Sequence, residues 1–169
     1  YAIIASCDVA AAMMEPPGGT SLVEESISEA LEFRRAMRKV DAEFGADESG
    51  GWWFKVWGPD HLAADGIGTR EDWMLKPGDA WHGFEQIAPG FNMLDPIKAT
   101  VITPGLNLDG SFADPGIPAA IVTKYLAEHG IIVEKTGLYS FFIMFTIGIT
   151  KGRWNTLVTA LQQFKDDYD

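Results

Sequence analysis

The sequence predicts an α+β fold in which a mostly antiparallel sheet has helices packed on one face. Two long segments carry apolar residues at three- and four-residue spacings, as amphipathic helices do. Several shorter segments have strand composition and are bounded by proline or glycine. Along the chain these elements lack the regular strand–helix alternation of a parallel sheet, which favours antiparallel pairing.

The longest predicted helix lies in the N-terminal third. Residues 1–14 are small and apolar, and they fit either a strand or a buried helix. EPPGG at 15–19 should break any regular element, so we place a subdomain boundary there. Ser21 and Glu24 have the spacing of a capping box. From there to about Gly45 the apolar spacing predicts an amphipathic helix.

The middle of the chain is expected to supply strands and loops. WWFKVW at 52–57 has strand composition, and residues 58–80, rich in proline and glycine, indicate mostly loop. PIKATVITPG at 96–105 alternates between proline boundaries, which predicts a strand. The aromatic residues of 52–57 and 141–145 indicate that the second face of the sheet also meets another surface.

The C-terminal part is expected to form a helix, two strands and a last helix. The first helix should run from about Ile117 to His129, with Gly130 as its C-cap. IIVEKTG at 131–137 and YSFFIMFTIGI at 139–149 follow as strands. Thr150 is expected to cap the last helix. The apolar face of that helix carries Trp154, Leu157, Val158, Leu161 and Phe164.

Composition narrows the class of protein. The 169 residues are 47% hydrophobic, enough for a core, and the net charge is −11 with a pI near 4.6. This acidity argues against nucleic acid and anionic membranes as partners. Cys7 is the one cysteine, which excludes an internal disulfide and fits a reducing, cytoplasmic setting. We expect Cys7 to be a small buried residue.

Few residues are candidates for chemistry. The histidines at 61, 82 and 129 lack metal-ligand spacing, so no metal site is predicted, and His129 should interact with a helix C-terminus. His82 in AWHGF and Lys98 in LDPIKAT are possible site-lining residues, although structural packing explains His82 better and an edge-strand or surface position explains Lys98 better. Glu134, within an apolar stretch, is either a solvated strand end or a carboxylate that binds a cationic ligand.

Several ordered segments give a more specific indication. They are YAIIASCDVAAAMM, WHGF, LDPIKATVITPG, GIPAAIVTKYLAEHGIIVEKTG, FFIMFTIGITKGRW and LQQFKDDYD. Together they resemble consecutive blocks of the bacterial ornithine/lysine/arginine decarboxylases, large pyridoxal-phosphate (PLP) enzymes of aspartate-aminotransferase fold type I. The resemblance implies that residues 1–15 are the tail of the PLP-binding subdomain. It implies that residues 16–169 are the small α+β subdomain, which closes over the active site.

The resemblance also implies what this chain contributes. The family's Schiff-base lysine lies in a Ser-x-His-Lys context that does not occur here, so we expect no catalytic or cofactor-binding residue in this chain and no activity from it alone. IIVEKTG matches the block in which a glutamate of the lysine-acting members binds the distal amino group of the substrate. That match assigns the role to Glu134 and implies conversion of lysine to cadaverine and CO2.

Other interpretations of the resemblance stay open. Glu134 favours lysine over ornithine and arginine, but TKGRW at 150–154 is similar to the arginine decarboxylases. A non-catalytic, decarboxylase-derived binding module is a further alternative. The resemblance implies a cytoplasmic homodimer or higher homo-oligomer that acts in acid resistance or polyamine synthesis.

Overall fold

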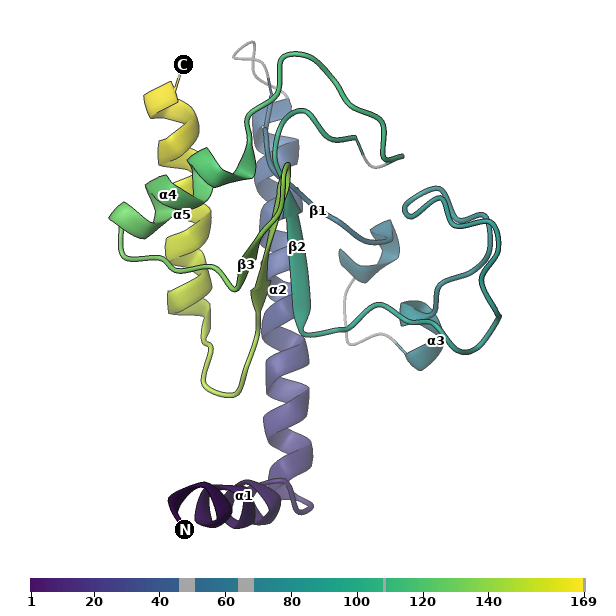
Figure 1. The fold of residues 1–169 in the computed structure, drawn as a ribbon, viewed down its shortest axis with the longest axis vertical. Coiled ribbons are helices and arrows are strands. Elements are labelled where there is room, and N and C mark those ends of the chain that lie inside the picture. Colours follow the sequence, from purple (N-terminus) through teal and green to yellow (C-terminus); the bar gives the residue numbers. More distant parts are fainter. Residues whose placement is uncertain (46–50, 64–68, 108, 169) are drawn as a thin grey trace.

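The computed structural model describes residues 1–45, 51–63, 69–107 and 109–168. Figure 1 shows a long central helix beside a small sheet, with two further helices on one side. In chain order the elements are α1 (Ala2–Met13), α2 (Gly18–Gly45), β1 (Lys55–Val56), the 3-10 helix η1 (Asp60–Ala63), α3 (Arg70–Trp73), β2 (Lys98–Ile102), α4 (Ala119–Glu128), β3 (Lys135–Thr136), β4 (Ser140–Met144) and α5 (Lys151–Tyr168). Within these described ranges, no helix combines the length and apolarity that a membrane crossing needs.

The four strands form one antiparallel sheet in the order β1-β2-β4-β3. In its central pair, Ala99 lies opposite Ile143 and Val101 lies opposite Phe141. Side chains directly opposite each other point to the same face of a sheet, and these residues belong to the main hydrophobic core or pack against it. The predicted antiparallel α+β fold is therefore confirmed.

Helices α2, α4 and α5 enclose that core on one face of the sheet (Figure 1). Phe33 of α2 is fully buried, and its ring centroid lies 5.5 Å from that of Phe145 and 6.1 Å from that of Trp154. The tilted and edge-on arrangement of these rings is the one that aromatic quadrupoles favour. The predicted apolar face of α5 is buried throughout. In α2 the predicted positions Leu31, Met37 and Val40 are buried, whereas Val23 at the start of the pattern is exposed.

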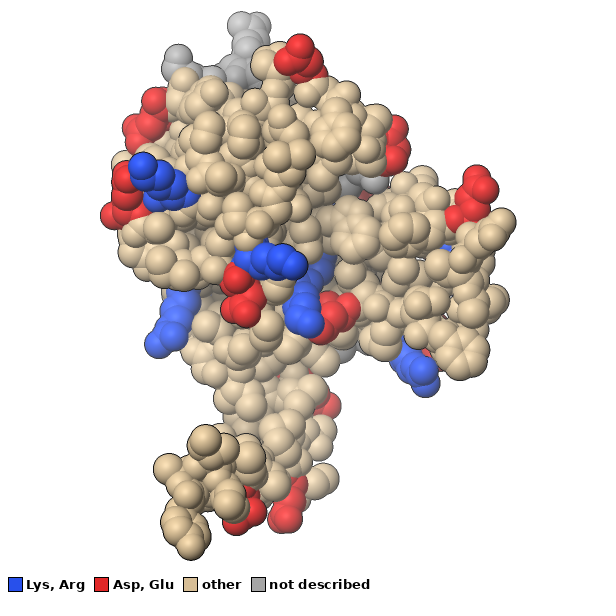
Figure 2. Space-filling view, in the orientation of Figure 1, with Lys and Arg blue, Asp and Glu red and all other residues tan. Residues whose placement is uncertain are grey.

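The N-terminal segment is a helix, and no residue of α1 is buried. It extends from the end of α2, away from the sheet, and Figure 2 shows that this lobe is mostly uncharged. Ile3 is 81% exposed and Val9 59%. Cys7 is also exposed, so the prediction that it is buried was wrong, because α1 makes no contact with the core.

Several boundaries differ from those predicted. α2 begins at Gly18, so Ser21 lies in its first turn and donates its hydroxyl to the Pro17 carbonyl at 3.3 Å instead of forming a capping box. Within 58–80, expected to be mostly loop, η1 and α3 form; residues 64–68 lie outside the described part. The loop segment expected at 45–51 lies largely outside the described residues.

The aromatic residues that led us to expect a second covered face of the sheet lie mostly on the first one. Trp52, Phe54, Phe141 and Phe145 are buried in the main core, so the aromatic residues mostly serve the helix-covered face. The outward face carries Lys98, Thr100 and Phe142 in the central strand pair, with Phe142 half-buried. The many aromatic residues of these two segments therefore indicate core packing, because every second side chain of a strand points to the same face and most of the large rings occupy the core-facing positions.

Candidate functional site

Glu134 lies at the edge of the sheet, directly before β3. Its backbone N–H donates to the carbonyl oxygen of Phe142 at 3.0 Å, which fixes the main chain at this position. The side chain is exposed. The location is that of a strand end, so what surrounds the carboxylate determines whether it can bind a ligand.

The surroundings of Glu134 form a pocket of about 250 Å³ between the sheet and the start of α5. Most of the wall is apolar and consists of Ile131, Ile132, Ile143, Met144, Phe145, Ile149, Trp154 and Leu157. Arg153 also lines it. Within the described part of the chain, neither Glu134 nor Arg153 has a side-chain hydrogen bond or ion pair. An apolar wall with one accessible carboxylate suits an aliphatic chain that ends in an ammonium group.

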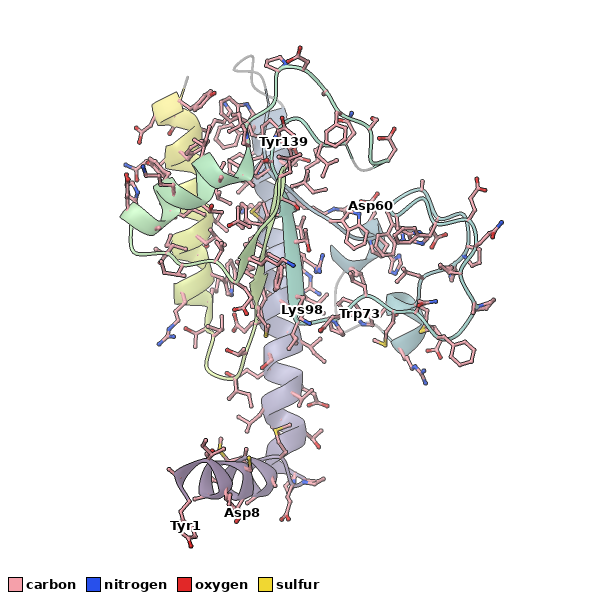
Figure 3. The ribbon with its side chains drawn as sticks, viewed as in Figure 1. Tyr1, Asp8, Asp60, Trp73, Lys98 and Tyr139 are labelled. Atoms are coloured by element: carbon pink, nitrogen blue, oxygen red, sulfur yellow. The ribbon has the colours of Figure 1, made fainter. Side chains whose placement is uncertain are left out.

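Lys98 lies at the same end of the sheet, where the chain enters β2 (Figure 3). Its cross-strand partner is Met144, which lines the Glu134 pocket. Lys98 Nζ forms an ion pair with Asp95 Oδ2 at 3.0 Å, and the Lys98 side chain is 45% exposed. Lys98 does not line the pocket. Lys98 in β2 and Glu134 directly before β3 therefore lie at one end of the sheet, but they do not line one cavity.

His82 lies in a separate aromatic cluster with Trp57, Trp81 and Phe84. Its ring stacks on Phe84 at 5.2 Å and meets Trp81 edge-on at 4.6 Å, while Trp57 contacts Trp81 at 4.8 Å. His82 Nδ1 accepts the Phe84 backbone N–H at 2.9 Å, which assigns the neutral tautomer with the proton on Nε2. Nε2 is buried without a partner among the described residues. These contacts are those of a packing residue, and His82 does not line the Glu134 pocket.

His129 lies at the C-terminal end of α4. It is the C-cap of this helix, and its Nδ1 lies 2.8 Å from the carbonyl oxygen of Tyr125, so its predicted place at a helix end is confirmed. Over the ranges that the structure describes, no group of three or more His, Cys, Asp and Glu side chains could hold a metal ion.

The Glu134 pocket does not fit PLP as a covalently held cofactor. A Schiff base needs a lysine amine, and among the described residues no lysine lines this pocket. The one cation among the described lining residues is Arg153, whose guanidinium cannot take that role. The pocket can therefore hold part of a substrate, but a covalently bound cofactor would need a lysine that it does not contain.

Arg34 is a further candidate that sequence reasoning missed. It is 4% exposed on α2, and it donates to the carbonyl oxygens of Trp57 and Lys98. The sequence feature that could have identified Arg34 is its position. It lies three residues after Leu31 and three before Met37, which places it on the buried side of the helix. A charged residue is rarely fully buried unless it is paired, so its place at a core position of an amphipathic helix marks it as a candidate.

Comparison with known proteins matches residues 1–153 to the family described as Orn/Lys/Arg decarboxylase, major domain. The chain is 53% identical over 170 residues to lysine decarboxylase LdcA of Pseudomonas aeruginosa, covering 100% of this chain and 22% of that protein. It is 40% identical over 184 residues to the biodegradative arginine decarboxylase of Escherichia coli, covering 100% of this chain and 24% of that protein.

A solved structure agrees with these sequence matches. Lysine decarboxylase A from Pseudomonas aeruginosa superimposes with a TM-score of 0.89 at 52% identity, covering 100% of this chain and 22% of that one. The chain thus spans about a fifth of the length of the proteins that it matches.

Proposed function

The chain belongs to the Orn/Lys/Arg decarboxylase family, and from this premise we propose that it is part of a PLP-dependent enzyme that converts lysine to cadaverine and CO2. One observation carries the proposal for substrate. Glu134 presents a carboxylate without a partner among the described residues at a mostly apolar pocket, at the position where the resemblance assigns recognition of the distal amine.

The chemistry of this pocket supports a basic amino acid. A carboxylate and an ammonium group form a charge-assisted hydrogen bond, which is about twice as strong as one between neutral groups. The apolar wall would contact the methylene chain of the substrate. A substrate without a distal cation would leave Glu134 unpaired in the closed site and would be rejected.

We assign residues 1–15 to the tail of the PLP-binding subdomain and residues 16–169 to the small subdomain. The mostly apolar and exposed side chains of α1 support this assignment, because a helix of that kind is normally buried by neighbouring structure. In this arrangement the small subdomain closes over the active site and brings Glu134 to the substrate. His82 and Lys98 remain predicted site-lining residues only.

PLP would be bound by residues outside this chain. When bound, it supplies the electron sink that decarboxylation needs. The contribution of this chain is recognition and closure, and the chain alone should be inactive. The proposal further includes a cytoplasmic homodimer or higher homo-oligomer that serves polyamine synthesis or acid resistance.

Arginine is the second candidate substrate, with ornithine third. The 40% identity to an arginine decarboxylase supports keeping arginine as an alternative. A non-catalytic binding module derived from such an enzyme is the alternative of a different class.

The test is product analysis with the longer protein that contains this chain, supplied with PLP. Lysine, ornithine and arginine are offered separately, and cadaverine, putrescine and agmatine are quantified. Cadaverine as the main product supports the proposal. Agmatine or putrescine as the main product would replace lysine by the corresponding substrate, and no amine from any substrate would favour the non-catalytic module.

A further inference from the structure

A second pocket lies between α2, β1 and η1, remote in sequence from Glu134. Its volume is about 160 Å³, and its charged lining residues are Arg34, Arg38, Asp41, Lys55 and Asp60. We call it the Arg34 pocket. Figure 3 shows Asp60 beside the sheet, on the side away from α4 and α5.

Arg34 carries a buried charge that no carboxylate neutralises among the described residues. Its Nη1 donates to the Trp57 carbonyl at 3.0 Å and its Nη2 to the Lys98 carbonyl at 2.9 Å. Its Nε is buried without a hydrogen-bond partner in the described structure. Burial lowers the pKa of Arg34 to about 10. A buried cation held only by neutral carbonyls is unfavourable unless an anion approaches it.

The charged residues of the Arg34 pocket have a net positive charge that one negative charge would neutralise. Arg38 forms an ion pair with Asp60, so these two neutralise each other. Among the described lining residues, two positive charges, Arg34 and Lys55, then remain with one negative charge, Asp41. One positive charge is therefore uncompensated. A carboxylate carries one negative charge at neutral pH, whereas a phosphate carries up to two and would reverse the balance.

Gly58 lines the pocket beside the guanidinium of Arg34. Its φ is +145°, and a Cβ built there would lie 3.1 Å from Arg34 Nη1. Each Nη nitrogen has two hydrogens and uses one for a carbonyl, so hydrogens remain for an incoming oxygen pair. The planar fork of arginine matches the two oxygens of a carboxylate.

We propose that the Arg34 pocket binds a carboxylate, with Arg34 as the main donor and Lys55 as a supporting charge. The carboxylate is either that of a small free acid or that of an Asp or Glu side chain elsewhere in the longer protein. The proposal is independent of the decarboxylase assignment, because it concerns a different pocket and predicts binding instead of catalysis.

The test measures thermal unfolding of the complete 169-residue chain by tryptophan fluorescence at pH 7.5. Sodium acetate is the probe, and it replaces sodium chloride at constant ionic strength. We expect a saturable rise in Tm, about 3 °C at ten times the half-saturating concentration. No difference between acetate and chloride would overturn the proposal.

Two lysine variants separate binding in the pocket from a general effect of the anion. Lys55→Gln should raise the half-saturating acetate concentration severalfold, since it removes an exposed charge from the pocket lining. Lys124→Gln, which removes an exposed charge on α4, should respond like the unchanged protein. An equal acetate response in all three proteins would contradict the proposal. This comparison does not depend on Arg34 variants, which lose two backbone contacts and could fail to fold.

The same titration on the longer protein identifies the source of the carboxylate. A retained acetate response indicates a pocket open to a free acid. Loss of that response, together with its presence in the 169-residue chain, indicates that a carboxylate side chain of the longer protein occupies the pocket. Either result supports carboxylate binding.

Discussion

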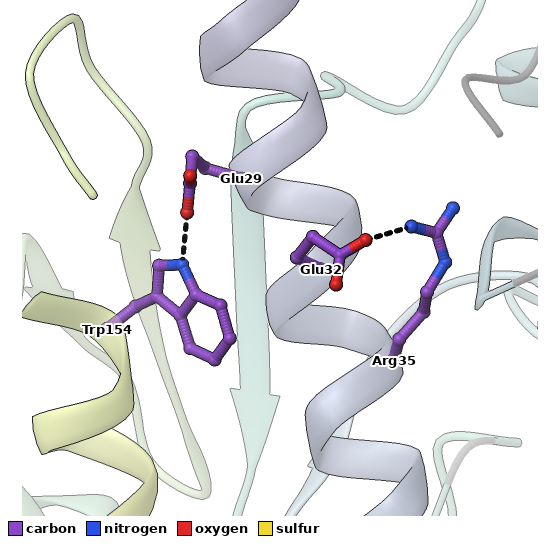
Figure 4. Close-up of polar contacts among 4 residues, drawn as sticks. All are labelled: Glu29, Glu32, Arg35 and Trp154. Atoms are coloured by element: carbon purple, nitrogen blue, oxygen red, sulfur yellow. Dashed lines mark hydrogen bonds and ion pairs between the residues drawn. The ribbon is translucent and has the colours of Figure 1, made fainter. Parts of the chain in front are cut away.

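Trp154 of α5 donates its indole N–H to a carboxylate oxygen of Glu29 on α2, with 2.5 Å between Nε1 and Oε2 (Figure 4). Trp154 is 4% exposed, so its N–H has little access to water. This bond joins the two long helices across 125 residues of sequence. Figure 4 also shows Glu32 and Arg35, an ion pair within α2.

Removal of the Glu29 carboxylate should destabilise the fold. Glu29→Ala leaves the indole N–H of Trp154 unsatisfied, and we expect a loss of about 1–3 kcal/mol in urea unfolding. Glu29→Gln retains an acceptor oxygen and should lose less. Glu25→Ala, at an exposed position of the same helix, is the matched control and should stay within about 0.5 kcal/mol of the unchanged protein.

Substitution of Glu134 tests the proposed recognition of the distal amine. In the longer protein with PLP, Glu134→Gln should lower kcat/KM for lysine about 10- to 100-fold, because a neutral amide replaces one partner of a charge-assisted hydrogen bond. Steady-state kinetics with Glu128→Gln, an exposed carboxylate of α4, as control measure this loss. An unchanged kcat/KM for Glu134→Gln would make Glu134 only a solvated strand end.

Tyr125 should make stability fall at high pH. Its hydrogen bond to Asp167, 2.6 Å long, raises the pKa of the Tyr125 hydroxyl to about 12. The folded state therefore holds this proton more tightly than the unfolded state, whose tyrosine pKa is about 10. The contribution of Tyr125 to the free energy of unfolding is fully present below pH 10 and is lost as the pH rises through 12.

Urea unfolding of the unchanged protein and of Tyr125→Phe from pH 9 to 12 measures this contribution. The difference in stability between the two should shrink as the pH rises. The lowered pKa of Arg34 acts in the same pH range with the opposite sign, but it is common to both proteins and cancels in the difference. A constant difference across this range would show that Tyr125 has no raised pKa.

Gly105 is expected to tolerate no side chain. Its φ is +106°, and a Cβ there would lie 2.8 Å from both the Cα of Gly116 and the ring of Tyr139. Gly105→Ala should destabilise the chain by about 3 kcal/mol or more, because conformational strain and overpacking add. Gly110→Ala is the control for strain alone, since its φ is +83° and its surroundings are open. Equal losses for both variants in urea unfolding would contradict the close approach.

The elements that the sequence predicted best are those with long local patterns. α2 and α5 have 28 and 18 residues, which gives several turns of apolar periodicity. η1 and α3 have four residues each, too few for any period. β3 comprises only Lys135 and Thr136, although IIVEKTG predicted a longer strand. Strand length depends on how far the partner strand runs alongside, which residue composition does not encode.

Of the two candidate pockets, a local sequence pattern pointed to the Glu134 pocket and not to the Arg34 pocket. The resemblance singled out Glu134 because a local block carries it, and its own sequence neighbours Ile131 and Ile132 help to line its pocket. Arg34 could not be assigned in this way, since its carbonyl partners lie 23 and 64 residues away. That Arg34 has no carboxylate partner in the described part of the chain becomes apparent only from the folded structure.

Because α2 is long, a small rotation of the chain just before it displaces the far end of the helix by a large distance. With 28 residues the helix is about 42 Å long. The sheet, α5 and η1 all contact α2, so this part of the molecule should turn with it as one body. A rotation of about 5° near residues 14–17 would displace the far end of the helix by about 4 Å. Small changes in backbone angle at EPPGG would thus become large movements of the surfaces that α2 carries.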